Sequence, residues 1–171
     1  NSGSIAQIHK AKMIDGTEVI LKIVHPNVED DMNLDIQILR LFKSYIPVKL
    51  DPIFEQFRAQ TDLVNEANSL IRFEKMFSGS PGFNIPKIYH SSKNILVMSF
   101  LPGDVQSVFE KKHPLRIKEL QALKVAGYYK MVCQDNYVHG DFHPGNILCN
   151  INTKGKLEIG IIDPSPCIEL T

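Results

Sequence analysis

The sequence contains few cysteines, and none of them are grouped. Cys133, Cys149 and Cys167 are the only three among 171 residues, and no two of them have C-x-x-C spacing. This pattern argues against a zinc ribbon and against a small fold held by disulfides. It fits a reducing compartment best.

Long apolar runs and dense basic clusters are also missing. The longest apolar stretches, such as residues 95–101, have the length of a strand and not of a membrane helix, which needs about 20 residues. The 19 Lys and Arg are balanced by 19 Asp and Glu, and no basic run reaches the density typical of nucleic-acid binding. The sequence therefore predicts no nucleic-acid partner and no membrane span within these residues.

What is present is an ordinary globular composition, with 43% hydrophobic and 22% charged residues. That is enough apolar material for one domain or two small lobes. The first residue is not Met, and strand-like patterns lie close to both ends. We therefore expect a chain that is cut at both ends, with any targeting signal outside it.

The first half alternates strand and helix patterns. Residues 4–13 and 18–25 predict two strands joined by a turn at Asp15-Gly16. A helix is predicted from 27 to about 43, and Asp51-Pro52 predicts the start of a longer one. Two more strands are predicted at 87–90 and 94–100. The longer helix should bury one stripe: Ile53, Phe57, Val64, Ala67, Ile71 and Phe77.

The second half predicts a helix over residues 114–134 and a hairpin formed by 147–151 and 156–162. Between the halves, Leu101-Pro102-Gly103-Asp104 interrupts the pattern. We take it as the boundary between an N-terminal lobe, 1–102, and a partial C-terminal lobe, 103–171. The helix should turn one side inward: Leu115, Leu120, Leu123, Gly127, Met131 and Val132.

Residues 139–148 place an acid and an amide five positions apart in a glycine-containing turn. Phosphoryl transfer uses a carboxylate at the acceptor hydroxyl and a neutral oxygen ligand for Mg²⁺, in the pattern H-x-D-x-x-x-x-N. Asp141 and Asn146 have this separation. The competing interpretation is a solvated turn, because Asp, Gly, Pro and Asn are common turn residues. In the same loop, His143 is expected to form a structural hydrogen bond and His139 to pack behind it.

Three further polar features each allow two interpretations. Lys22 lies in an apolar strand, so it either extends to solvent or pairs with an anion in a cleft. Glu66 is a surface acid unless it is paired. Gly3 and Ser4 could let backbone N–H groups approach a phosphate, or they belong to a flexible end. Asp163, at the end of the predicted hairpin, could return beside Asn146.

The order of these residues, from strand lysine and helix glutamate to loop Asp and Asn and a last Asp, matches protein-kinase-like enzymes. Four segments together resemble the UbiB, or aarF-domain, family of atypical kinases: 4–11, 21–26, 60–68 and 139–148. The resemblance implies an α+β, two-lobed kinase-like fold that binds ATP and Mg²⁺. It also implies a role in ubiquinone biosynthesis or in mitochondrial or bacterial membrane lipid homeostasis.

The resemblance assigns a role to each position. Lys22 would hold the phosphates and pair with Glu66, and Gly3 and Ser4 would belong to the nucleotide loop. Asp141 would act at the acceptor or an attacking water, and the metal ligands would be Asn146 and Asp163. The implied partners are ATP and a lipid or quinone-related small molecule. A mitochondrial location is implied, with membrane association only through segments outside this chain.

The sequence departs from the family pattern at several places. The K-x-G-Q helix is absent, and residues 1–4 replace an alanine-rich loop. The E-x-D motif reads Gln60-Thr61-Asp62, and D-F-G reads Asp163-Pro164-Ser165. Gln60-Thr61-Asp62, together with a loop lacking the alanines, resembles the divergent eukaryotic branches of the family more than its quinone-kinase core. Pro164 biases Asp163 toward extended conformations, and we expect Asp163 to be held in one orientation, with metal binding kept and turnover slow.

Two other functions compete with an active kinase or ATPase. A pseudokinase that binds nucleotide or a partner is favoured by the Pro164-Ser165 replacement and by the missing acid at position 60. A small-molecule kinase of the aminoglycoside type has a similar catalytic loop but is disfavoured by residues 4–11.

Overall fold

The computed structural model describes residues 5–41, 55 and 61–170. Its elements, in chain order, are as follows: β1 Ala6–Lys12, β2 Glu18–Val24, α1 Val28–Leu41, α3 Leu63–Phe77, β3 Phe83–Asn84, β4 Ile88–Ser91, β5 Ile95–Ser99, β6 Asp104–Val105, α4 Gln106–Lys112, η2 Pro114–Arg116, α5 Ile117–Tyr129, η3 Lys130–Gln134, β7 Tyr137–His139, η4 Pro144–Asn146, β8 Ile147–Ile151, β9 Leu157–Ile161 and β10 Cys167–Glu169. Helices and sheets are both present, so the expected α+β class is confirmed.

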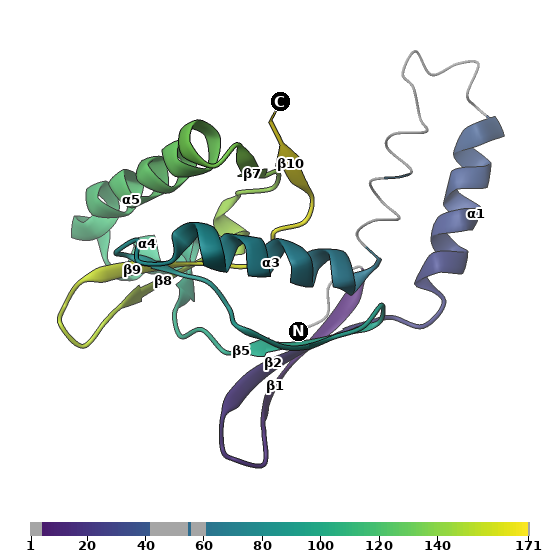
Figure 1. Ribbon diagram of the computed structural model, residues 1–171, viewed down its shortest axis with the longest axis horizontal. Helices are drawn as coiled ribbons and strands as arrows, with labels where there is room; N and C mark the ends of the chain where they lie inside the picture. Colours follow the sequence, from purple (N-terminus) through teal and green to yellow (C-terminus); the bar gives the residue numbers. More distant parts are fainter. Residues whose placement is uncertain (1–4, 42–54, 56–60, 171) are drawn as a thin grey trace.

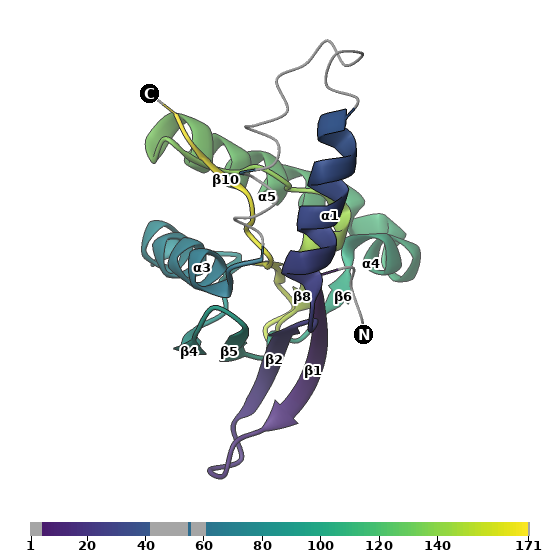
Figure 2. The same cartoon turned by 90° about the vertical axis from the view of Figure 1, so that its right-hand side faces the viewer.

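The first sheet is antiparallel, with strand order β1-β2-β5-β4. The predicted hairpin joins β1 to β2, and Gly16 in its turn has φ +86°, a conformation that glycine adopts without the strain other residues meet. α3 lies along one face of this sheet (Figure 1). Figure 2 shows α1 standing beyond the end of β2. Acids in the first turn of α1 and Arg40 in its last turn both favour its helix dipole.

α3 begins at Leu63, with Asp62 as its N-cap; the Asp62 carboxylate accepts a hydrogen bond from the Val64 N–H at 2.9 Å. The predicted helix start at Asp51-Pro52 lies outside the described residues, as do Ile53 and Phe57. The predicted buried stripe is only partly right. Ala67 and Phe77 are buried, but Val64 is half-buried and Ile71 is 38% exposed. The buried face consists of Leu63, Glu66, Ala67, Leu70, Phe73 and Phe77.

The second sheet has the order β3-β9-β8-β6 and is covered by α4 and α5. Its core contains Phe109, Leu120, Ile147, Cys149, Leu157 and Ile159. β8 and β9 form the predicted hairpin, whereas β3, β6 and α4 were not predicted from the sequence. Leu115 was wrongly placed inside: it is 96% exposed, because a 3₁₀ turn with Pro114 precedes the α-helix.

A third cluster connects α3 to the second half of the chain, including β7, which pairs with β10 in a separate two-stranded sheet. Phe73 and Phe77 of α3 pack against Met131, Val138 and Ile161 from the second half of the chain. In addition, β3 lies in the first half but pairs with β9. After β5 the chain passes close to β8 at Gly103. An added Cβ at Gly103 would lie 2.8 Å from the Cys149 carbonyl oxygen, so glycine is needed there. The division into lobes 1–102 and 103–171 stays a prediction.

Candidate active site

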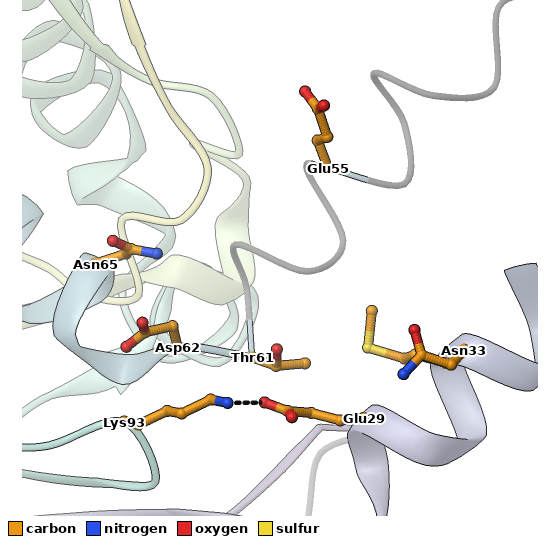
Figure 3. A pocket seen from close by; sticks show the side chains of 8 residues that line it. Glu29, Asn33, Glu55, Thr61, Asp62, Asn65 and Lys93 are labelled. Carbon is orange, nitrogen blue, oxygen red and sulfur yellow. Dashed lines mark ion pairs between the residues drawn. The ribbon is translucent and has the colours of Figure 1, made fainter.

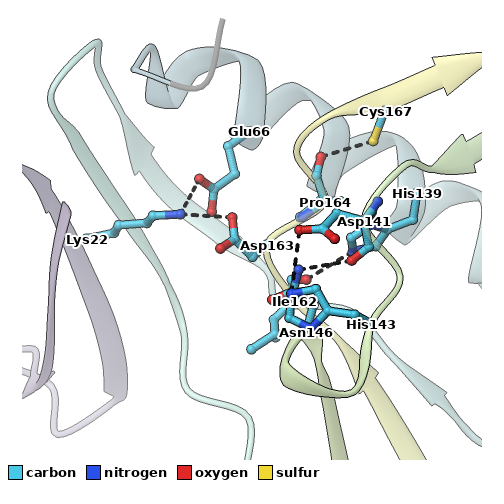
Figure 4. Close-up of polar contacts among 10 residues, drawn as sticks. All are labelled: Lys22, Glu66, His139, Asp141, His143, Asn146, Ile162, Asp163, Pro164 and Cys167. Carbon is cyan, nitrogen blue, oxygen red and sulfur yellow. Dashed lines mark hydrogen bonds and ion pairs between the residues drawn. The ribbon is translucent and has the colours of Figure 1, made fainter. Parts of the chain in front are cut away.

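Lys22 projects from β2 toward two carboxylates. Its Nζ lies 2.6 Å from Glu66 Oε2 and 3.0 Å from Asp163 Oδ1 (Figure 4). The Lys22 side chain is 12% exposed, so the alternative in which it extends to solvent is wrong. Burial alone would lower the pKa of Lys22, but the charges of Glu66 and Asp163 outweigh burial and raise it. The lysine therefore stays charged, and the predicted ion pair with Glu66 is confirmed.

Glu66 enters this group from the buried face of α3. Its side chain is 5% exposed, so it is not a surface acid. Burial raises the pKa of Glu66, and the nearby Asp163 carboxylate raises it further, while Lys22 opposes both effects. One oxygen, Oε1, is buried and has no hydrogen-bond partner. An unsatisfied buried carboxylate oxygen is costly in a folded protein, so this atom is suited to receive a ligand group or a water molecule.

Asp141 is held by its own loop. Its backbone N–H donates to His139 Nδ1 at 3.1 Å, and its carbonyl oxygen accepts from the Asn146 side-chain amide at 3.1 Å. The same carbonyl accepts from the His143 N–H at 2.8 Å. The Asp141 carboxylate remains about half exposed. The loop therefore fixes the backbone of Asp141 and leaves its acid group accessible.

The two histidines of the loop have the structural positions expected for them. His139 is 2% exposed, and its ring contacts Phe73 and Phe142. Burial lowers the pKa of His139, which keeps the ring neutral. Because its Nδ1 accepts from Asp141, its Nε2 carries the proton and donates to the Ile162 carbonyl at 3.2 Å. His143 Nδ1 accepts from the Gly145 N–H at 2.9 Å.

The β8–β9 hairpin brings Asn146 close to Asp163. The Ile162 N–H donates to the Asn146 carbonyl at 3.1 Å, one step beyond the Ile147–Ile161 pair. The side-chain NH₂ of Asn146 is used by Asp141, so its Oδ1 is the atom that can act as a ligand. The hairpin therefore delivers one amide oxygen and one carboxylate to the same place.

The expected extended conformation of Asp163 is wrong. Its φ is +52°, in the left-handed region, although the residue before a proline is biased toward extended conformations. Aspartate is among the few residues that enter this region at modest cost. The tight turn is held by the Ser165 N–H, which donates to the Asp163 carbonyl at 2.8 Å, and by the Lys22 ion pair. The local hydrogen bond and the long-range ion pair together override the preference set by Pro164.

A cavity of about 240 Å³ lies between the first sheet and the β8–β9 hairpin. The predicted residues Lys22, Glu66, Asn146 and Asp163 line it, whereas Asp141 does not. Gly3 and Ser4 lie outside the described residues. The apolar part of the wall was not predicted from the sequence; it includes Ile8, Ile20, Met98, Phe100, Leu101 and Leu148. The β2 alternation places Ile20 and Lys22 on one face and could have indicated part of it.

A second, more open depression of about 570 Å³ lies between α1 and the start of α3 (Figure 3). Lys93 and Glu29 form an ion pair of 2.6 Å across it, and Asp62 of the Gln60-Thr61-Asp62 segment lies on its wall. None of the predicted site residues line it. The cavity at Lys22 is therefore the better candidate for chemistry.

The described residues contain no group of three or more His, Cys, Asp or Glu arranged to hold a metal. Among the same residues, no helix has both the length and the apolar character needed to cross a membrane. Asn146 and Asp163 alone still fit Mg²⁺, because this ion is usually held by one or two protein oxygens together with water and substrate phosphates. The charge around the cavity, one lysine against two carboxylates, also favours a cation.

The strand lysine, helix glutamate, catalytic loop and final aspartate define a kinase-like domain, and solved structures agree. The chain superposes on the Rv3197–erythromycin complex of Mycobacterium tuberculosis with a TM-score of 0.82 and 24% identity, over 99% of this chain and 45% of that one. It matches the Rio2 kinase–ADP/Mg²⁺–phosphoaspartate complex of Chaetomium thermophilum with a TM-score of 0.60 and 16% identity, over 99% and 47%.

The family follows from the sequence match. Residues 1–168 match the model of the ABC1 atypical kinase-like domain, and the chain belongs to that family. It is 34% identical to a probable serine/threonine-protein kinase, abkC, of Dictyostelium discoideum, over 86% of this chain and 23% of that protein. It is 30% identical to a probable protein kinase UbiB of Sodalis glossinidius, over 85% and 30%. For the AarF domain-containing kinase 1 of Drosophila melanogaster, the identity is 28%, over 99% and 35%. The chain thus spans about a quarter to a third of these relatives.

Proposed function

We propose that this domain binds ATP with Mg²⁺ in the cavity at Lys22 and uses Asp141 for phosphoryl transfer or ATP hydrolysis. The observation that carries the proposal is the convergence of Lys22, Glu66, Asn146 and Asp163 on one cavity. Residues from three separate parts of the chain meet there with the charges that a metal–nucleotide complex requires. The Rio2 kinase, a structural neighbour, is described with ADP and Mg²⁺.

One part of the cavity wall is apolar and another part is charged, so the two parts suit different groups of a nucleotide. Ile20, Met98 and Leu148 offer an apolar surface for the flat face of a base. The charged end, with Lys22, would receive phosphate oxygens. The volume of about 240 Å³ lies below the usual range of small-molecule sites, so it suits the base and its neighbouring groups better than a whole nucleotide.

Each polar residue has a separate task in this proposal. Lys22 would neutralise phosphate charge while Glu66 holds its ammonium in place. Asn146 Oδ1 and the Asp163 carboxylate would hold Mg²⁺, which supplies charge neutralisation at the phosphates when it is bound. Asp141 would orient the acceptor hydroxyl or a water molecule and accept its proton. The accessible carboxylate and fixed backbone of Asp141 suit this task.

Asp141→Asn in the full-length protein tests the assignment. ATP turnover should fall by about 10²-fold or more, because a positioned acid or base typically contributes 10² to 10⁴. ATP affinity should stay within about twofold, because Asp141 does not line the cavity. Asp15→Asn, in the β1–β2 turn, is the matched control. Unchanged turnover in Asp141→Asn would place the chemistry elsewhere.

A pseudokinase is the second candidate, and two observations favour it. Lys22 already binds Asp163, so the residue proposed for the metal is engaged by the residue proposed for the phosphates. Asp163-Pro164-Ser165 also replaces the usual D-F-G segment. Mg²⁺-dependent ATP binding without turnover above background in the wild-type protein would support this function over catalysis.

The wider role stays a proposal taken from the family resemblance. It comprises a lipid or quinone-related acceptor, a contribution to ubiquinone biosynthesis or lipid homeostasis, and a mitochondrial location. Turnover measured with quinone precursors and with a peptide hydroxyl as acceptors would test the acceptor class.

A further inference from the structure

The His143 side chain makes two contacts on opposite edges of its ring. On one edge, Nδ1 accepts from the Gly145 N–H at 2.9 Å. On the other edge, Nε2 lies 3.5 Å from Asp141 Oδ2 (Figure 4). Both His143 and Asp141 are about half exposed, so neither contact results from deep burial. The ring therefore bridges a backbone amide of the loop and its acid.

The contact with Gly145 decides which nitrogen of His143 carries the proton. An imidazole nitrogen that accepts a hydrogen bond has no proton of its own. The bond from Gly145 thus requires a neutral ring protonated at Nε2. That proton lies on the edge of the ring nearest to Asp141, whose Oδ2 is 3.5 Å from Nε2. A doubly protonated ring would lose the Gly145 bond.

The His143 ring also packs against Gly145. A Cβ added to Gly145 would lie 2.6 Å from His143 Cε1 and 2.9 Å from Nδ1. Real Cβ atoms essentially never approach so closely, so the ring lies directly against the glycine backbone. Gly145 thus has two effects on His143: it supplies the hydrogen bond and leaves room for the ring.

His139 and Asn146 hold only the backbone of Asp141, through its N–H and its carbonyl oxygen. Rotation of the carboxylate about the side-chain bonds is not restricted by either. In the described part of the chain, His143 Nε2 lies 3.5 Å from one oxygen of this carboxylate. A separation of 3.5 Å is long for a hydrogen bond, and such contacts in ligand-free sites commonly shorten when substrate binds.

We propose that His143 is a positioning residue for Asp141: its Nε2–H binds Oδ2, which turns the other carboxylate oxygen toward the acceptor. The inference rests on the proposed function, because Asp141 must be the group that meets the acceptor. His143 itself does not touch substrate and exchanges no proton with it. Its effect is on the rate of the chemical step and not on nucleotide binding.

Two amide substitutions separate the two edges of the ring. In His143→Asn, the short side-chain amide can still accept from Gly145 but does not reach Asp141. In His143→Gln, the longer amide can reach Asp141 and donate to it. His90→Asn, on the edge strand β4, is the control for replacing a histidine as such.

ATP turnover in the full-length protein should separate these variants. We expect kcat to fall about 10-fold to 100-fold in His143→Asn, because misplacing a catalytic group by about 1 Å costs up to 10². KM for ATP should change by less than about twofold. His143→Gln should recover most of the rate. In an Asp141→Asn background, His143→Asn should cause no further loss. Equal losses in the Asn and Gln variants, or an additive loss in the double variant, would overturn the proposal.

A spectroscopic measurement tests the contact without activity. The ¹⁵N shifts of the neutral His143 ring should report the Nε2–H tautomer, and Asp141→Asn should shift the Nε2 signal while Asp15→Asn does not. An Nδ1–H tautomer, or a signal insensitive to Asp141→Asn, would overturn the positioning role. A wild-type protein without turnover but with the expected signals would instead refute the proposed catalysis and leave the contact established.

Discussion

At the scale of single residues, Glu66 and Lys22 depend on each other. Burial makes the ionised form of Glu66 costly, and Lys22 offsets that cost at a distance of 2.6 Å. Removing the lysine would leave Glu66 and Asp163 facing each other without a cation. Removing the charge of Glu66 leaves Lys22 paired with Asp163. Replacing Lys22 and replacing Glu66 with neutral residues should therefore lower the free energy of unfolding by unequal amounts.

Glu66→Gln should change how stability depends on pH. The pKa of Glu66 is raised from its ordinary value of 4.5, so in the window above pH 4.5 the folded state binds more protons than the unfolded state. The Glu66 contribution to the free energy of unfolding is then present below pH 4.5 and is lost as pH rises through the folded pKa. The raised pKa of Lys22 acts only above its ordinary value of 10.5.

Urea denaturation between pH 4 and 8 measures this effect as the difference between wild type and Glu66→Gln. The wild-type free energy of unfolding should fall relative to the variant as pH rises. Groups such as Asp15 and Glu169, whose pKa values are lowered, cancel in the difference. Glu74→Gln, an exposed acid on the same helix, is the control. A difference that does not change with pH would contradict the raised pKa of the buried Glu66 carboxyl group.

At the scale of elements, α3 shows where a sequence pattern becomes ambiguous. Apolar residues occur on more than one side of this helix, so spacing alone allowed a stripe through Ile71. The real face turns toward two partners: Leu63, Ala67 and Leu70 pack on the first sheet, and Phe73 and Phe77 pack on the second half of the chain. The second partner is distant in sequence, and no local rule could have named it.

Phe73→Ala should lower the free energy of unfolding by about 3 to 5 kcal/mol, because Phe73 is fully buried and its removal leaves a cavity. Ile71→Ala is the matched control on the same helix. With 38% of its surface exposed, Ile71 should contribute only about 1 kcal/mol. Denaturant unfolding of both variants provides the comparison. Similar losses would mean that the helix is rotated relative to the face described above.

The elements predicted correctly are those with local signals. The Asp15-Gly16 turn, the β8–β9 hairpin and the loop at Asp141 are each specified by neighbouring residues. β3 and β6 have two residues each and exist only through pairing with β9 and β8. The charged residues of the site were found from their types and order. The apolar cavity wall and the left-handed φ of Asp163 depend on sheet register and tertiary contacts, which the sequence does not display.

At the scale of the whole molecule, the ion group at Lys22 joins the two four-stranded sheets. Lys22 comes from the first sheet, and Asp163 follows the last strand of the second. Glu66 completes the group from the helix that packs against both. A ligand that draws Asp163 away from Lys22 would therefore act on the contact between the two parts of the molecule.

Asp163→Ala should reduce the Mg²⁺-dependent part of ATP affinity by about 10-fold or more, because the proposed metal ligand is lost. Asp163→Asn separates charge from backbone effects, since Asn also tolerates a positive φ.

Replacing Pro164 with Phe and Ser165 with Gly should raise turnover if this turn restrains Asp163, because glycine frees the backbone. Titration of ATP with and without Mg²⁺ measures the affinity of the Asp163 variants, and ATP turnover measures the effect of the double replacement. Unchanged affinity in Asp163→Ala would exclude a metal at this residue.

The third hydrophobic cluster also has a consequence for how the protein is made. Phe73 and Phe77 are synthesised well before Met131, Val138 and Ile161, the residues that cover them. The N-terminal part of the chain leaves the ribosome first. The aromatic face of α3 therefore remains exposed to solvent until the β8–β9 hairpin has emerged. During that interval the nascent chain presents an apolar helix face of the kind that chaperones bind. Slower translation of the intervening stretch would lengthen this exposure and favour aggregation over folding.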